Sequence, residues 1–287
     1  MIRLHRRAAV FSLAAALLTP SLAVAEDKAD VLSIGGSVTE IIAALGQQDR
    51  LKARDTTSSY PPAVMDLPDV GYMRALSPEG VLSVGPSLII SEEDAGPPEA
   101  LEVIRAADVA FVEVPDARDA AGILQKIEVI GNALSVPERA DRLAGEVGAS
   151  LSQAIKKAER PEAVKKRVLF VLSTQGSRIN ASGTGTEADA IIRMAGGINA
   201  VTEFEGYRQM TDEAVGLAAP DVILMMDRGG DHGIADDELF AMPAVKLSPA
   251  AQTRSVVRMD GLLMLGFGPR TAEAVTKLSA AIYADGA

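Results

Sequence analysis

Residues 76–90 read LSPEGVLSVGPSLII, and residues 210–224 read MTDEAVGLAAPDVIL. The two stretches align without a gap. Each opens with a hydroxyl side chain that can cap a helix, Ser77 or Thr211, and each has a proline just before an apolar run. Each stretch therefore predicts a short helix, a turn and a buried strand. The predicted strands are Ser87–Ile90 and Asp221–Met225.

A looser correspondence extends this repeat toward the start of each half. Residues 31–34 form a predicted strand that enters a helix through glycines, with Ser37 and Glu40 spaced as a capping box. Residues 168–172 form a similar strand, and the helix after it is expected to begin near Thr186. Strands that alternate with helices predict parallel sheets, so the sequence indicates two related α/β lobes.

One long amphipathic helix is predicted between the two halves. Apolar residues recur every four positions from Leu143 to Ile155, and Pro161 closes the pattern. The predicted fold is α/β, with two Rossmann-like lobes that contain parallel sheets and are joined by this single helix. The lobes span 26–136 and 162–287, and the helix spans 137–161. A stiff connector allows little closure, and a ligand cleft is expected between the lobes.

Residues 1–25 have the pattern of a secretory signal peptide. Arg3, Arg6 and Arg7 precede an apolar run, and Ala23 and Ala25 frame a cleavage site. No later stretch is apolar over the length of a membrane span. The mature chain is therefore expected to be exported and soluble.

The composition excludes several classes of function. A formal net charge of −11 disfavours nucleic-acid binding. The absence of cysteine means no disulfides and no lipoprotein anchor, so the expected location is the periplasm. His5 would leave with the signal peptide, and His232 would be the one histidine of the mature chain. Histidine metal clusters and a Ser-His-Asp site that needs a second histidine are therefore disfavoured.

The segment 68–80 carries the most distinctive chemistry. It reads PDVGYMRALSPEG and places the phenol of Tyr72, the guanidinium of Arg74 and the helix-opening carboxylate of Glu79 close together. A phenolate is a hard anionic donor that suits ferric iron, and tyrosine is a known ligand of haem iron. A free phenol titrates near pH ~10, so a nearby cation would help the phenolate to form. In an extended segment Arg74 projects to the same side as Tyr72.

The chain resembles the substrate-binding proteins (class III) that serve ABC importers of haem, cobalamin and ferric siderophores. Within that class it looks most like the periplasmic haem-binding proteins. The segments that carry the resemblance span nearly the whole mature chain, and the one around Tyr72 is the most specific of them. They are residues 33–40, 53–58, 67–74, 195–200, 207–208 and 265–268.

The resemblance implies that Tyr72 is the axial ligand of ferric haem. The cargo would be haem b, bound without a covalent link because the chain has no C-x-x-C-H, and Arg74 would hydrogen-bond the phenolate. Tyr60 is a competing phenol, although it precedes two prolines in a predicted turn. Tyr207, from the second lobe, could face the cleft or be an ordinary surface tyrosine.

Haem propionates need cations or hydrogen-bond donors. Arg208, Arg178 and Arg228 are candidates in predicted second-lobe loops, and Arg208 ranks first because it matches the family's Tyr-Arg pair. Arginines at such positions are more often solvated surface residues, so only this match sets Arg208 first. Some relatives carry a histidine ligand after the first strand of the second lobe. This chain has none there, and His232, in a glycine-rich loop, is the one available imidazole.

Glu79 and Glu213 occupy equivalent positions in the repeat. In the class that this chain resembles, one glutamate on each lobe pairs with arginines of the permease, so these two are expected to dock onto a permease dimer in the inner membrane. Acids near helix N-termini also stabilise the helix dipole, and both roles are compatible. Position 206, which corresponds to Tyr72 in the repeat, is a glycine. Docking is therefore expected to be symmetric, and iron ligation is expected to come chiefly from the first lobe.

Three functions remain in competition at this point. The leading hypothesis is a non-enzymatic carrier that captures haem and delivers it to an ABC importer. A second keeps the fold and changes the cargo to a ferric siderophore or cobalamin, although the 3% aromatic content argues against aromatic walls. The third is an exported hydrolase with a nucleophile such as Ser58, which no G-x-S-x-G turn supports.

Overall fold

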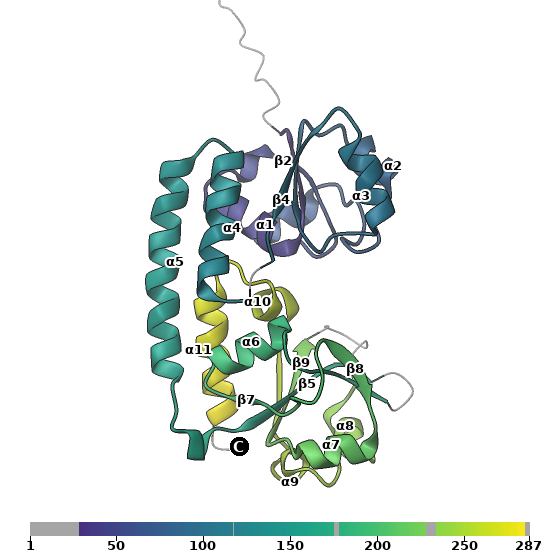
Figure 1. The fold of residues 1–287 in the computed structure, drawn as a ribbon, viewed down its shortest axis with the longest axis vertical. Helices are drawn as coiled ribbons and strands as arrows, with labels where there is room; N and C mark the ends of the chain where they lie inside the picture. Colours follow the sequence, from purple (N-terminus) through teal and green to yellow (C-terminus); the bar gives the residue numbers. More distant parts are fainter. Residues whose placement is uncertain (1–28, 117, 175–177, 228–233, 285–287) are drawn as a thin grey trace, which may run out of the picture.

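The computed structural model contains two α/β lobes stacked along one long helix (Figure 1). The structure describes residues 29–116, 118–174, 178–227 and 234–284. The predicted signal peptide, Arg228 and His232 lie outside these described residues.

The N-terminal lobe is built on a parallel sheet that has, within the described residues, four strands in the order β2-β1-β3-β4. Its central strands are apolar on both faces, as strands of a covered parallel sheet are. Helices α1 and α4 pack against the face that contains Val31, and helices α2 and α3 pack against the face that contains Leu32. The elements are β1 (Val31–Ile34), α1 (Gly36–Ala44), β2 (Leu51–Arg54), α2 (Pro78–Ser83), β3 (Leu88–Glu92), α3 (Pro98–Arg105), β4 (Ala110–Val114) and α4 (Ala120–Ala133).

The C-terminal lobe contains a mixed sheet. Its strands within the described residues follow the order β10-β9-β5-β6-β8, with β7 paired to β5. β9 and β10 run parallel to β5, whereas β6 is antiparallel to β5 and β8 is antiparallel to β6. The sheet therefore differs from the predicted parallel sheet, because the glycine-containing stretch after β5 folds back as a strand. The strands are β5 (Arg167–Ser173), β6 (Ile179–Ser182), β7 (Ile198–Asn199), β8 (Tyr207–Met210), β9 (Val222–Asp227) and β10 (Val256–Asp260).

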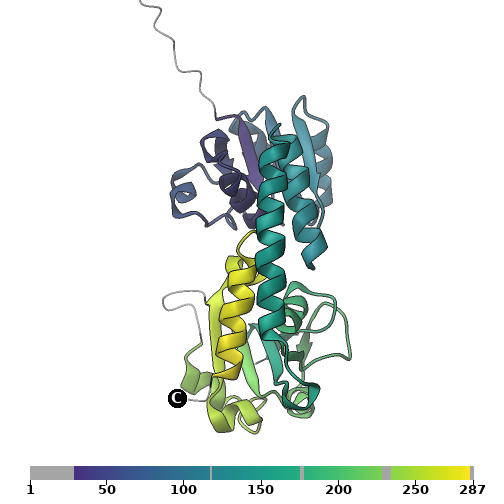
Figure 2. The ribbon, with the colours of Figure 1, turned by 90° about the vertical axis from the view of Figure 1, so that its left-hand side faces the viewer.

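Helix α5 (Pro137–Ala158) confirms the predicted connector and runs along both lobes (Figure 2). α4 packs beside it in the N-terminal lobe and α11 (Thr271–Tyr283) packs beside it in the C-terminal lobe. One apolar core continues from Val31 through Val147 and Leu151 of α5 to Phe170. The other helices of the C-terminal lobe are α6 (Glu187–Met194), α7 (Asp212–Ala218), α8 (Asp236–Ala241), α9 (Pro249–Thr253) and α10 (Gly261–Leu265).

The repeat predicted from the sequence is confirmed at its caps. The Ser77 hydroxyl accepts the N–H of Gly80 at 3.3 Å, where α2 begins. The Thr211 hydroxyl accepts the N–H of Ala214 at 3.2 Å, where α7 begins. Strands β3 and β9 follow these two helices, as expected.

The predicted capping box at the start of α1 is wrong. The N-cap residue is Gly35, which makes no side-chain cap, and both Ser37 and Glu40 lie inside the helix. Both side chains are buried and bind partners from distant parts of the chain instead, which local spacing cannot reveal.

Within the part of the chain that the structure describes, no helix is long and apolar enough to cross a membrane.

Candidate functional site

A cavity of about 580 Å³ lies between the two lobes. On the N-terminal side it is lined by residues at or just after the carboxyl ends of the four strands, including Ser37, Thr57, Glu92 and Asp116, and by Tyr72 from the loop between β2 and α2. This is the edge at which parallel α/β sheets bind ligands. Most of the facing wall is apolar, with residues 261–266 after β10. The volume of the cavity lies in the range of small-molecule binding sites.

Tyr72 is held by a segment that is tied to the edge of the N-terminal sheet. The N–H of Arg54, the last residue of β2, donates to the carbonyl of Pro68 at 2.9 Å. The N–H of Val70 returns a bond of 2.9 Å to the carbonyl of Arg54. The Arg54 guanidinium also pairs with Asp69 at 3.1 Å. The backbone before Tyr72 is therefore fixed by three contacts to one residue of the sheet.

The turn into Tyr72 requires a glycine. Gly71 has a φ of +100°, which is unfavourable for residues with a Cβ, and its N–H donates to Asp69 Oδ1 at 2.8 Å. On the far side of the turn, the N–H of Gly96 donates to the carbonyl of Met73 at 2.8 Å. The phenol of Tyr72 lines the cavity from this anchored loop with 45% of its surface exposed.

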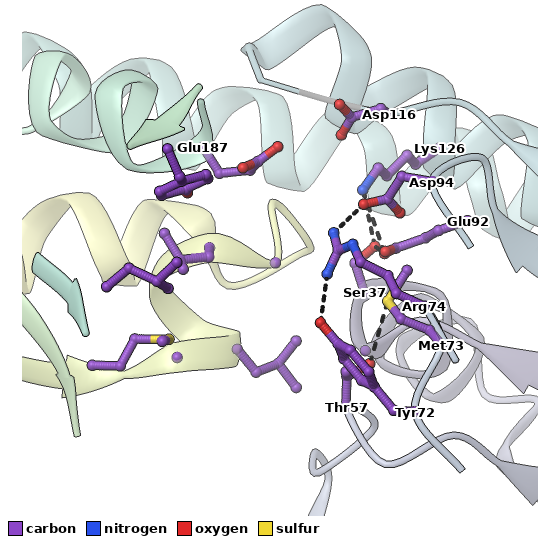
Figure 3. A pocket seen from close by; sticks show the side chains of 18 residues that line it. Ser37, Thr57, Tyr72, Met73, Arg74, Glu92, Asp94, Asp116, Lys126 and Glu187 are labelled. Atoms are coloured by element: carbon purple, nitrogen blue, oxygen red, sulfur yellow. Dashed lines mark hydrogen bonds and ion pairs between the residues drawn. The ribbon is translucent and has the colours of Figure 1, made fainter. Parts of the chain in front are cut away.

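Arg74 provides a cation beside the Tyr72 phenol. Its guanidinium donates to the Tyr72 hydroxyl oxygen at 3.1 Å and also forms an ion pair with Asp94 (Figure 3). Burial alone would lower the pKa of Arg74, but the bond to Tyr72 and the charge of Asp94 outweigh it and raise that pKa. Arg74 is thus a permanent cation within hydrogen-bond distance of the Tyr72 oxygen.

The second lobe also supplies a phenol to the cavity. Tyr207 lines the opposite wall, and its ring meets Phe170 edge-on with the centroids 6.3 Å apart. Burial raises the pKa of Tyr207 to about 12, and the negative charge of Glu187 adds to this shift. Tyr207 is therefore a neutral phenol at physiological pH. Tyr60, the competing phenol, lies outside the cavity lining, with the Arg270 guanidinium 3.5 Å from its ring centroid.

The predicted propionate partners do not gather at this cavity. Arg208 lies in β8, not in a loop, and it projects away from its neighbour Tyr207 because side chains alternate along a strand. Its guanidinium lies 5.4 Å from the ring centroid of Phe204. Arg178 is described and exposed but is not among the cavity-lining residues, and Arg228 lies outside the described residues. Their contact with haem stays a prediction.

A buried polar cluster in the N-terminal wall was missed by the sequence reasoning. The Lys126 ammonium lies 3.0 Å from the Ser37 hydroxyl and 3.6 Å from a Glu92 carboxylate oxygen, and Ser37 donates to Glu92. Only 3% of Lys126 is exposed. Burial raises the pKa of Glu92, while the charge of Lys126 and the bond from Ser37 oppose this shift. A readable signal existed, because Lys126 occupies the apolar face of α4 beside Ile123, Ile127 and Ile130.

Charged residues also connect the two walls. Arg118, which precedes α4, pairs with Asp116 at 2.6 Å and with Glu187 of the second lobe at 3.1 Å. Both carboxylates line the cavity. Figure 3 shows Glu187 on the opposite side of the cavity from the labelled side chains of the N-terminal lobe. Each of the four carboxylates in the lining thus has a cationic partner.

Glu79 and Glu213 are not among the cavity-lining residues. Both are exposed at the second residue of their helices, α2 and α7. These helices belong to different lobes, and both lie on the side of the molecule away from α5 (Figure 1). The placement leaves both carboxylates accessible to a partner.

Two α/β lobes, a rigid connecting helix and a cavity between the lobes define a binding protein that captures its ligand between two domains. The sequence profile described as "Periplasmic binding protein" matches residues 31–262, and the chain belongs to this family. The family assignment confirms the class of protein that the sequence resembles.

Among proteins of known structure or described function, the chain is similar to heme-binding and vitamin B12-binding proteins. The chain is 38% identical to the periplasmic heme-binding protein BhuT, solved in complex with two hemes, with a TM-score of 0.83 over 88% of this chain and 98% of that one. It is 37% identical to the heme-binding protein RhuT from Roseiflexus sp. RS-1, with a TM-score of 0.84 over 88% and 97% of the two chains. A vitamin B12-binding protein of Vibrio cholerae is 24% identical over 91% of this chain and 92% of its own length.

Proposed function

We propose that this protein binds one or more ferric haems in the periplasm and delivers them to an ABC-type importer. The observation that carries the proposal is the phenol of Tyr72, hydrogen-bonded by Arg74 at the edge of an interlobe cavity. The similarity to two heme-binding proteins at 37–38% identity supports the same cargo.

The donor set fits ferric haem. The phenolate of Tyr72 would be the axial ligand, and the Arg74 guanidinium would stabilise its negative charge. Met73, Leu172, Met226, Leu262 and Leu265 line the cavity and offer apolar contact to a porphyrin face. The cargo would be haem b, held without a covalent bond, since the sequence contains no cysteine.

The protein is proposed to act without catalysing a reaction, as the binding proteins of its family do. Glu79 and Glu213 would pair with cationic residues on two permease subunits, one for each lobe. The pattern in residues 1–25 supports export, and the lack of cysteine supports a chain that is not lipid-anchored. The docking role follows from the exposure of the two glutamates and their placement on separate lobes.

A titration of the purified protein with hemin tests the cargo. We expect a saturable high-spin ferric spectrum with a phenolate charge-transfer band, and Tyr72→Ala should abolish the band and weaken binding. Tyr60→Phe is the matched control, since Tyr60 contacts Arg270 and does not line the cavity. Unchanged binding and spectrum in Tyr72→Ala would show that the ligand assignment is wrong.

Cobalamin is the second candidate cargo, and the relatives that are named vitamin B12-binding proteins are the observation that favours it. The two candidate cargoes are haem and cobalamin. A phenolate ligand such as Tyr72 suits the iron of ferric haem, and this favours haem. A competition titration separates them. Excess cyanocobalamin should leave the hemin spectrum unchanged, and displacement of hemin at comparable concentration would favour cobalamin instead.

A further inference from the structure

The cluster of Lys126, Ser37 and Glu92 has no role in iron ligation, although all three residues line the cavity. Lys126 is a lysine with 3% exposure in the middle of a helix face that is otherwise apolar. Burying an ammonium is costly unless it is paired, so a position of this kind calls for an explanation.

The surroundings of Lys126 form an anion site. Helix α1 begins at this wall of the cavity, and its N-cap residue Gly35 provides no side-chain cap. The backbone amides of a helix N-terminus attract negative charge, and the Gly35 N–H already donates to Asp55 Oδ1 at 3.0 Å. Lys126 Nζ and the Ser37 hydroxyl are 3.0 Å apart at the same place. An ammonium, a hydroxyl and a helix N-terminus therefore converge on one point of the wall.

Glu92 now fills this site with a carboxylate from the chain itself. Its side chain packs over Gly35, where an added Cβ would lie 2.6 Å from the Glu92 carboxyl carbon. Its partners are Ser37 and Lys126, and Asp55 and Asp94 are the neighbouring carboxylates whose charge it experiences. Burial and those like charges oppose the ionisation of Glu92, while Lys126 and the Ser37 hydroxyl favour it. Glu92 thus marks where a carboxylate binds in this wall, and another carboxylate would have to displace it.

The other cations in or beside the cavity, Arg74 in its lining and Arg118 next to it, already have partners. Arg74 is bound to Tyr72 and Asp94, and Arg118 joins Asp116 to Glu187 across the lobes. Freeing either cation would disturb the proposed iron ligand or the contact between the walls. Lys126 can change partner without either consequence.

We propose that Lys126, with the Ser37 hydroxyl and the start of α1, is a carboxylate subsite that receives a propionate of the bound haem in place of Glu92. This inference rests on the proposed haem-binding function. It assigns the propionate contact to the first lobe and to a helix residue, in place of the second-lobe arginines expected from the sequence.

Hemin and its dimethyl ester, which lacks the free carboxylates, provide the test. Both are titrated into the full chain and into Lys126→Met, Glu92→Gln and the double variant, with Lys156→Met as a control. Lys156 is an exposed lysine on α5, so this substitution makes the same change in net charge away from the cavity. Circular dichroism and thermal melts verify folding. The double variant covers the case in which Lys126→Met leaves Glu92 buried without a partner and fails to fold.

We expect Lys126→Met and the double variant to weaken hemin binding by roughly ten- to a hundredfold, the factor for losing one hydrogen bond to a charged group. Binding of the dimethyl ester should stay close to wild type. Glu92→Gln removes the competing charge and should raise the preference for hemin over the ester.

Equal effects of the Lys126 variants on hemin and ester, or no effect on either, would overturn the subsite while leaving haem binding intact. If the wild type binds neither compound, both the subsite and the proposed function fail.

Discussion

Two tyrosines present phenols to the same cavity, but their surroundings select between them. Tyr72 is nearly half exposed and accepts a bond from a permanent cation, whereas Tyr207 is largely buried near the carboxylate of Glu187. Burial first, and then the charge of Glu187, raise the pKa of Tyr207 to about 12. The first lobe thus offers an exposed phenol beside a cation, and the second offers a neutral hydrogen-bonding phenol.

This difference predicts distinct spectra for the two phenylalanine variants. Between pH 7 and 9, hemin bound to Tyr207→Phe should keep the phenolate charge-transfer band, and its affinity should fall less than about tenfold, the cost of one neutral hydrogen bond. Tyr72→Phe should lose the band. A band that disappears in Tyr207→Phe and survives in Tyr72→Phe would reverse the assignment.

The raised pKa of Glu92 predicts an unusual pH dependence of the free energy of unfolding. Burial raises its pKa in the folded state above the ordinary value of 4.5, so the folded chain binds this proton more tightly than the unfolded chain. The contribution of Glu92 to the free energy of unfolding should therefore fall as pH rises above about 4.5, by up to about 1.4 kcal/mol per pH unit within the shifted range.

Urea unfolding of wild type and Glu92→Gln at several pH values between 4 and 8 measures this effect. Because glutamine does not titrate, the variant should gain stability relative to wild type as pH increases. A difference that moves in the opposite direction would mean that the charge of Lys126 dominates the burial of Glu92.

At the scale of elements, the loop that carries Tyr72 is positioned by the edge of a sheet and by one aspartate. Asp69 uses one carboxylate oxygen to accept the Gly71 N–H and the other to pair with Arg54. The first contact sets the turn into Tyr72, and the second ties the loop to β2. These roles can be separated by substitution.

Asp69→Ala removes both contacts and should weaken hemin binding by roughly fivefold, which corresponds to the loss of about one net hydrogen bond near 1 kcal/mol. Asp69→Asn keeps an oxygen for the Gly71 N–H and should retain most of the affinity. Hemin titrations of the two variants make the comparison. Equal losses would assign the positioning of Tyr72 to the ion pair with Arg54 instead of the turn.

Local patterns in the sequence predicted local structure well, and contacts between distant segments explain the misses. The caps Ser77 and Thr211, the connector α5 and strand β1 all follow from periodicity and turn residues. Strands β6 and β8 pair antiparallel through a stretch with weak patterning. Ser37 and Glu92 are 55 residues apart, and Lys126 and Ser37 are 89 apart. The lysine on the apolar face of α4 indicates a buried partner, but local sequence does not identify that partner as Ser37 or Glu92.

At the scale of the whole molecule, the lobes are joined by more than α5. Glu40 of α1 accepts the Arg270 backbone N–H at 3.0 Å and its guanidinium at 2.8 Å. Arg270 directly precedes α11, and its guanidinium also covers the ring of Tyr60 in the first lobe. Together with the apolar core that continues along α5, this contact fixes the width of the cavity between the lobes.

Removing one partner from a buried ion pair leaves the other charge without compensation. Glu40→Ala should therefore lower the free energy of unfolding by about 3 kcal/mol, since 5% of the Glu40 side chain and 21% of the Arg270 side chain are exposed. Glu40→Gln, which keeps an acceptor for the Arg270 N–H, should cost less. Chemical denaturation of Glu40→Ala, Arg270→Ala and the double variant completes a double-mutant cycle, and additive losses would show that the two residues do not interact.

The proposed docking with the permease is also a property of the whole molecule, because the two carboxylates lie on separate lobes whose spacing the rigid connection fixes. If each carboxylate meets one permease subunit, Glu79→Lys and Glu213→Lys should each reduce haem delivery, and the double variant should reduce it to background. Haem affinity should not change, since both residues lie outside the cavity lining.

The measurement is haem uptake, or stimulation of ATP hydrolysis, with the cognate importer reconstituted in lipid vesicles. Glu146→Lys reverses an exposed charge on α5 and controls for the change in net charge. Delivery that survives the double reversal would remove the docking role and leave these glutamates as acids that stabilise their helix N-termini. Loss of delivery in Glu146→Lys as well would instead point to long-range charge attraction, because a rigid two-point contact depends on where the charges lie and net charge does not.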